Sequence, residues 1–318
     1  MRAFLIKRIL ALIPTIIFAT LIVFVVIRLI PGDVIDQMVS QHDIGSQEIS
    51  RKALEKALGL DVPVAVQYLR WMERIFLHGD LGNSLWKQTP VTSLVMERLP
   101  TTFEVSGIAI IFSLLLAIPI GVYSAIRQDT AGDYTGRTIA ILGISIPNFY
   151  LGTMVVIYPA IWWGWSPSVE LVPFTKDPLA NLKQFIVPSI VLGLSLSGVT
   201  MRMMRAMMLE VLRQDYIRTA WAKGLKEKVV IIRHALKNAL IPVVTVFGLY
   251  LPVLIGGTIV IEQIFVLPGM GNLMFDAIQQ RDYPIITGLM MIIGVVVLVC
   301  NLLVDMSYGY LDPKIRFR

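Results

Sequence analysis

The stretch TTFEVSGIAIIFSLLLAIPIGVYSAI (Thr101–Ile126) decides the fold of this chain. It stays apolar over the length that a bilayer core demands, because about 20 helical residues, each rising about 1.5 Å, cross the hydrocarbon. Lipid offers no hydrogen-bond partner to an open backbone, so a segment of this kind must be helical. The stretch therefore predicts a transmembrane helix.

Further apolar runs of similar length lie on both sides of this stretch. The chain of 318 residues is 56% hydrophobic and 16% charged, with a mean hydropathy of +0.72, whereas soluble domains carry about 25% charged residues. We expect an all-α, polytopic membrane protein with six transmembrane helices, at Ile9–Ile30, Thr101–Ile126, Thr138–Trp163, Phe185–Met204, Ala239–Ile261 and Ile285–Tyr308. The first run exceeds the roughly 7–15 apolar residues of a signal peptide and is expected to be retained.

Basic residues in the connecting segments set the orientation. The segment Met201–Asn238 is rich in Lys and Arg, including Arg202 and Arg205, which we interpret as anchors at the inner membrane surface. With six spans, both termini are then cytoplasmic. Basic cytoplasmic loops held against anionic lipid explain the net charge of +6 better than nucleic-acid binding does.

This orientation divides the chain into four parts. We expect a cytoplasmic tip and first helix at 1–30, an external domain at 31–100, a five-helix core at 101–308 with a cytoplasmic loop at 207–238, and a cytoplasmic tail at 309–318. Helical spacing within the external domain occurs at Ser50–Leu58 and at Val64–Phe76, where the apolar positions are Val66, Leu69, Met72 and Phe76. Gly79–Gly82 marks a turn. The domain could be a lid, a docking surface for a soluble partner or a packed cap.

The cytoplasmic loop contains a short amphipathic segment, DYIRTAWAKG (Asp215–Gly224). Asp215 suits the N-cap of a helix that begins at Tyr216, and Gly224 suits the left-handed residue that ends it. One apolar stripe is predicted at Ile217, Ala220, Trp221, Gly224 and Leu225, with Arg218 and Lys223 off the stripe. The residues alone leave two interpretations open: a helix seated in a partner's groove, or one lying on the lipid surface.

Several strings together resemble a known family. Gln214–Leu225, followed by Ile232–Val243, closely resembles the loop of the inner-membrane permease subunits of ABC importers, in their dipeptide, oligopeptide and nickel branch. Matching strings occur in the family's order along nearly the whole chain, among them Arg28–Asp33, Gly79–Ser84, Gly143–Pro147, Gly256–Glu262, Pro268–Gly271 and Tyr310–Arg316.

The chain also departs from the family's pattern. The superfamily motif Glu-Ala-Ala, three residues, then Gly falls on Arg218, Thr219 and Ala220 before Gly224, so its glutamate is absent. Trp221 stands where the branch usually has Arg, which would replace one polar contact to the ATPase by an apolar one. Leu267 stands where Trp is common.

The resemblance implies a coupling helix that seats in a cleft of an ATPase subunit. The implied ATPase-coupling residues are Asp215, Tyr216, Ile217, Arg218, Thr219, Ala220, Trp221, Ala222, Lys223, Gly224 and Leu225. The implied partners are a second, homologous permease subunit in a heterodimer, two ATPase subunits and an external substrate-binding protein, in a bacterial or archaeal cytoplasmic membrane. Peptides are the expected substrate, while nickel, glutathione and oligosaccharides stay open.

The chain shows no phosphate-binding loop of the Gly-x-x-x-x-Gly-Lys-[Ser/Thr] type, so we expect no enzyme and no cofactor here, with ATP and Mg²⁺ bound by the ATPase subunits. His42, His78 and His234 lack metal-ligand spacing. An ion-coupled secondary transporter would show paired intramembrane carboxylates or inverted repeats, and neither is clear. Pro242 is a candidate hinge. Glu262 lies near the outer end of its span, where water or headgroups can reach it; we favour a structural role, and an external gate is the alternative.

Overall fold

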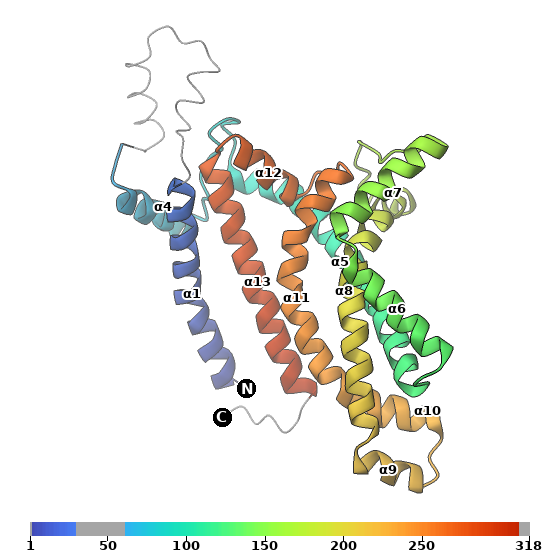
Figure 1. Cartoon of the computed structure of the whole chain (residues 1–318). Helices are drawn as coiled ribbons and strands as arrows, with labels where there is room; N and C mark the ends of the chain where they lie inside the picture. Colours follow the sequence, from blue (N-terminus) through green and yellow to red (C-terminus); the bar gives the residue numbers. More distant parts are fainter. Residues whose placement is uncertain (1, 30–60, 312–318) are drawn as a thin grey trace. The chain divides into compact units, whose positions relative to one another are not determined.

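The computed structural model describes residues 2–29 and 61–311, and Figure 1 shows the course of the chain. Across these residues the regular structure is helical, apart from one isolated bridge between Asn83 and Pro90, which confirms the all-α prediction. The predicted helix at Ser50–Leu58 and the tail beyond residue 311 lie outside the described residues. The chain forms two compact units, which are taken separately below.

One unit comprises residues 2–100 and 269–296. It contains α1 (Arg2–Leu29), α4 (Val64–His78), the first turns of α5 (Val91–Ile126), α12 (Met270–Gln279) and the first half of α13 (Tyr283–Leu311). Helix α4 lies against α1, where Phe24 packs on the rings of Tyr68 and Trp71 and Thr20 Oγ1 lies 3.1 Å from the Tyr68 hydroxyl.

The helix predicted at Val64–Phe76 is therefore present. Of its apolar positions, Leu69 and Phe76 are exposed, whereas Val66 and Met72 are half-buried, and Met72 Sδ lies 3.9 Å from Thr20 Oγ1 of α1. Tyr68 and Trp71 make the ring contacts with Phe24, because aromatic side chains bury a large apolar surface.

The segment between α4 and α5 is held to the turn between α12 and α13 of the same unit. Gly79 and Gly82 take the left-handed backbone, at φ 63° and 92°, which the predicted turn requires. The buried Asp282 carboxylate then accepts hydrogen bonds from Ser84 Oγ at 2.5 Å and from the backbone N–H of Leu85 at 3.1 Å. One carboxylate thus fixes a loop nearly two hundred residues away in sequence.

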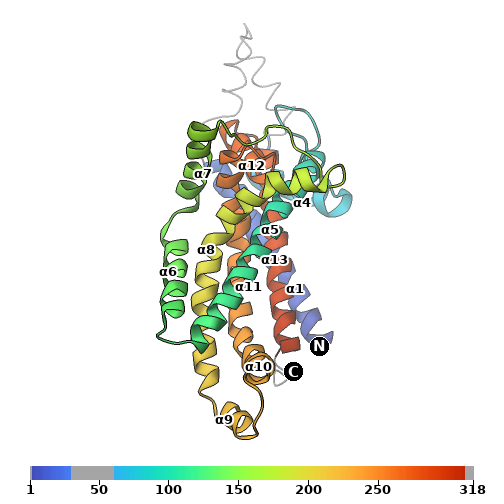
Figure 2. The ribbon, with the colours of Figure 1, turned by 90° about the vertical axis from the view of Figure 1, so that its right-hand side faces the viewer.

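The second unit comprises residues 101–268 and 297–318. It contains most of α5, then α6 (Ala131–Ser145), α7 (Asn148–Trp163), α8 (Pro178–Leu212), α9 (Asp215–Ala222), α10 (Glu227–Val229), η1 (Val230–Leu236), α11 (Lys237–Ile264) and the second half of α13. Helix α8 runs between α6 and α11 and packs on both (Figure 2).

Glycines bring the backbones of α5, α6 and α8 unusually close together. A Cβ atom at Gly198 would lie 2.5 Å from the carbonyl oxygen of Ala140, and one at Gly143 would lie 2.9 Å from that of Leu194. On the α5 side, a Cβ at Gly121 would lie 2.8 Å from the Met204 Cβ. Small residues at helix contacts permit this spacing in membranes, where dispersion and hydrogen bonds rather than the hydrophobic effect drive helix association.

Four helical segments among the described residues are long and apolar enough to cross a membrane, namely Val91–Ile126, Pro178–Leu212, Glu227–Tyr250 and Tyr283–Val304. Helices α6 and α7 make a fifth if they count as one span, but they bend by 93° relative to each other. The third predicted span, Thr138–Trp163, is therefore not one straight helix. Pro147 causes the break, because the residue before a proline avoids the helical region, and Ile146 is extended at φ −89° and ψ 118°.

Candidate coupling site

Helix α9 forms at the segment that the sequence singled out, at the end of α8 (Figure 2). Its N-cap is the extended residue Gln214, so the prediction that Asp215 caps the helix is wrong by one position. The Asp215 carboxylate instead pairs with the Arg218 guanidinium at 3.2 Å within the first turn. The helix ends at Lys223, and Gly224 turns the chain with a left-handed φ of 72°, as predicted.

The inner face of α9 is buried in an apolar cluster. Ile217 is completely buried and Ala220 nearly so. The cluster joins four neighbouring elements, with buried members Ala125, Met204, Met208, Val230, Ala235, Ala239 and Val243. Helix α9 therefore packs on η1, and its buried side chains belong to a cluster that includes residues at the end of α8 and the start of α11.

The outer face of α9 is exposed. Trp221 is 45% exposed, and Tyr216, Arg218, Thr219, Ala222, Lys223 and Gly224 are exposed as well. The predicted stripe is thus divided, because Ile217 and Ala220 face inward, Leu225 is half-buried and Trp221 faces outward. Tyr and Trp with a neighbouring Arg form the composition that protein interfaces favour.

The start of α11 is joined to α9 by a hydrogen bond and by a widened helix. Asn238 Nδ2 donates to the Tyr216 hydroxyl at 2.8 Å. Between them, Val230–Leu236 forms a π-helix, a rare element that occurs often at functional sites. Sequence reasoning missed it, because a π-helical turn has no distinct apolar period in so short a segment.

Pro242 and Glu262 both lie in α11. Pro242 is half-buried beside Val243 of the apolar cluster. Glu262 is completely buried and accepts a hydrogen bond from Thr102 Oγ1 of α5 at 2.7 Å. Water does not reach Glu262 within this structure, and the contact supports the structural role between α5 and α11 that the sequence favours over a gate.

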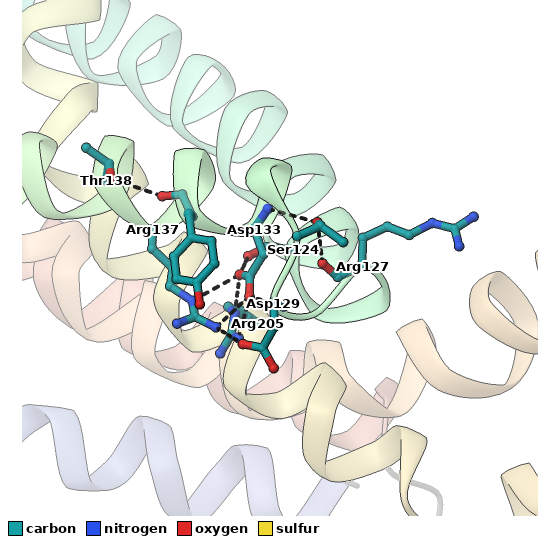
Figure 3. A network of polar contacts seen from close by, with 9 residues as sticks. Ser124, Arg127, Asp129, Asp133, Arg137, Thr138 and Arg205 are labelled. Atoms are coloured by element: carbon teal, nitrogen blue, oxygen red, sulfur yellow. Dashed lines mark hydrogen bonds and ion pairs between the residues drawn. The ribbon is translucent and has the colours of Figure 1, made fainter.

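A polar network lies where α5, α6 and α8 meet, and sequence reasoning missed it (Figure 3). Asp133, in the first turn of α6, is completely buried and pairs with Arg205 of α8, whose Nε and Nη2 lie 2.8 and 2.9 Å from the two carboxylate oxygens. Arg137 and Ser124 also donate to this carboxylate. Arg205 is thus an ion-pair partner inside the protein, whereas Arg202 is exposed as an anchor would be. A short acidic turn followed by a distant arginine gives no sequence signal.

Among the described residues, no three His, Cys, Asp or Glu side chains come close enough together to hold a metal ion. The site offers instead a short helix with a fixed inner face and a free outer face, attached to two long helices. Such an arrangement can receive force from a bound partner and pass it to α8 and α11.

This chain belongs to the family described as binding-protein-dependent transport system inner membrane component, which matches residues 117–317, and the N-terminal part of such components matches residues 1–106. It is thus a multi-pass ABC permease of the peptide branch. It is 39% identical to the oligopeptide transport system permease protein AppB of Bacillus subtilis (strain 168) and 37% identical to the dipeptide transport system permease protein DppB of Escherichia coli (strain K12), and each match covers both chains completely.

Two solved structures share the fold. An inward-facing MetNI methionine ABC transporter matches with a TM-score of 0.55 at 16% identity, over 70% of this chain and 97% of that one. An amino acid ABC transporter matches with a TM-score of 0.51 at 14% identity, over 69% of this chain and 94% of that one.

Proposed function

We propose that this chain is a permease subunit of an ATP-driven importer and forms half of the pathway for di- or oligopeptides delivered by a binding protein. Support for peptides comes from two relatives, named for oligopeptide and dipeptide transport, that match over their full lengths. The proposal includes six spans, cytoplasmic termini and an external part at 31–100. It also includes a second permease and two ATPase subunits, which supply the ATP and Mg²⁺ sites.

The observation that carries the coupling role is the division of α9 into two faces. Ile217 and Ala220 are buried in the apolar cluster that includes residues of α8, η1 and α11, while Tyr216 and Trp221 stay exposed. A helix lying on lipid would turn its whole apolar stripe to the membrane. In this chain the stripe is divided, and an aromatic outer face beside the basic Arg218 suits a protein groove better.

The proposed cycle follows from this attachment. ATP binding closes the ATPase pair, and α9 moves with the subunit in which its outer face sits. Because α9 is fixed to the ends of α8 and α11, both helices tilt, with Pro242 as the hinge in α11, and the cavity between the permeases opens outward. Nucleotide can shift this equilibrium only through contacts that differ between the two states.

The test is copurification of the ATPase subunits with the permease, together with uptake of a radiolabelled dipeptide by proteoliposomes that contain the complete complex and its binding protein. Trp221→Ala should weaken the attachment of the ATPase subunits by about tenfold or more, as for a central interface Trp. The matched control is Trp163→Ala, since Trp163 of α7 is also exposed. ATPase subunits that copurify equally with all three proteins would refute the coupling role of α9.

The same proteoliposomes separate the alternatives for substrate and energy source. Competition with unlabelled nickel, glutathione or oligosaccharide, in place of peptide, would identify a different cargo. Uptake driven by an ion gradient without ATP would instead show a secondary transporter.

A further inference from the structure

The polar network at Asp133 joins α6 to α8 through an ion pair. Arg205 of α8 meets both carboxylate oxygens with two nitrogens of its guanidinium, a forked contact that fixes orientation as well as distance. Figure 3 shows the Arg205 and Arg137 side chains converging on Asp133 from different helices. Ser124, from the last turns of α5, and the backbone N–H of Asp129 complete the shell around the carboxylate.

Two arginines neutralise Asp133, but only one of them connects helices. Arg137 lies four residues further along α6 itself, and its ion pairs stay within α6 and the turn just before it, at Asp129. Arg205 reaches Asp133 from α8, seventy-two residues away in sequence, and only 19% of its side chain is exposed. A buried carboxylate needs compensating charge, and Arg137 already supplies some, so the geometry of Arg205 serves a further purpose.

The position of Arg205 on α8 suggests that purpose. Its immediate neighbour Met204 and the next turn's Met208 are completely buried in the cluster that holds Ile217 of α9. Adjacent positions on one turn of α8 therefore belong to the cluster that holds the coupling helix on one side and bind Asp133 of α6 on the other. Just beyond, Gly121 of α5 and Gly198 of α8 let the three backbones approach closely.

We propose that Arg205 is a positioning residue that clamps α6, and with it the end of α5, to α8, so that a displacement of α9 moves the three helices as one body. The proposal rests on the coupling role of α9 given above. Without the clamp, α9 would still attach to its partner and move α8, but α6 would no longer follow.

The first test compares the two arginines in the complete reconstituted transporter. Arg205→Gln should reduce the number of peptides imported per ATP hydrolysed by tenfold or more, with ATPase subunits still attached. Arg137→Gln removes an equal charge from the same carboxylate and should change this ratio less than twofold. Arg202→Gln, on the exposed side of α8, controls for loss of charge from that helix.

The second test reports directly on the movement. With Cys300 replaced by Ser, spin labels at the exposed positions Thr138 of α6 and Ala206 of α8 measure the separation of the two helices. In the Arg205→Gln protein, the distribution of distances between the two labels should shift or broaden between the nucleotide-free and ATP-trapped states. In the wild type it should stay the same in both states. If Arg205→Gln does not assemble, Arg205→Lys keeps the charge without the fork and should show the same effect in weaker form.

The outcomes separate the clamp from the proposed function. Equal loss with Arg205→Gln and Arg137→Gln would overturn the clamp, because neutralisation alone would then explain the network. A wild-type transporter whose α6–α8 distance changes with nucleotide would also overturn it. A wild-type complex without ATP-dependent peptide uptake would overturn the proposed function, and the clamp with it.

Discussion

Ile217→Ala is expected to release α9 from the rest of the chain. With eight residues the helix is too short to be stable alone, since isolated helices below about 12–15 residues are marginal in water. Ile217 is completely buried in the cluster with Met204 and Met208. The substitution removes three carbon atoms at about 0.8 kcal/mol each, and the cavity left behind raises the total to about 2–4 kcal/mol. At about 1.4 kcal/mol for each factor of ten, the docking equilibrium falls by roughly 30-fold to 700-fold.

Hydrogen–deuterium exchange of the backbone amides at 215–223 measures this equilibrium in the purified permease. Those amides should exchange faster by a factor in that range in the Ile217→Ala protein, while amides within α8 should change little. Ile232→Ala is the matched control, because Ile232 is exposed in the adjoining π-helix. Unchanged protection of α9 in the Ile217 variant would refute the argument that its inner face holds it.

Three other substitutions test the backbone and the polar contacts. A Cβ atom at Gly224 would meet no atom within 4 Å, so the main cost of Gly224→Val is the left-handed φ of 72°, about 1–2 kcal/mol. Gly224→Asn should cost less, because Asn tolerates this conformation better, and peptide uptake per ATP should fall more in the Val protein than in the Asn protein. Equal loss in both would contradict the backbone explanation. Gly198→Ala places a Cβ 2.5 Å from the Ala140 carbonyl oxygen and should destabilise the detergent-solubilised protein by about 1–3 kcal/mol, which lowers its melting temperature. Gly107→Ala is the control, because a Cβ there meets no atom within 4 Å. Equal melting temperatures of the two variants would contradict the close approach of α6 and α8. Asp282→Ala leaves the donors of Ser84 and Leu85 without their acceptor, which should cost about 1–3 kcal/mol of stability. Proteolytic cleavage within residues 83–90 should then be faster. An unchanged cleavage rate would show that other contacts hold the loop.

Sequence patterns worked well where one physical requirement dominates a long stretch. The apolar runs had to be helical in lipid, and α1, α5, α8, α11 and α13 cover five of them, whereas the run at Thr138–Trp163 is divided between α6 and α7. The same patterns predicted the ends and the bends of helices less well. Pro147 was visible in the sequence, but whether a proline bends a helix slightly or by 93° depends on what surrounds it.

The candidate site shows the same division. An amphipathic helix with a left-handed end was readable from Ile217, Ala220, Trp221 and Gly224, because helical period and glycine conformation are local properties. Which half of that stripe faces inward was not readable, since it depends on Met204 and Met208 of another helix.

The sequence by itself determined that this chain is a helical membrane protein with a short amphipathic helix in a basic loop, because lipid permits few alternatives and the helical period is local. Only the tertiary structure decided that α9 offers Tyr216 and Trp221 outward, and that Asp133 and Arg205 meet across α6 and α8. The physical reason is that burial and ion pairing depend on residues brought together from distant parts of the chain, and no local sequence pattern identifies which residues these are.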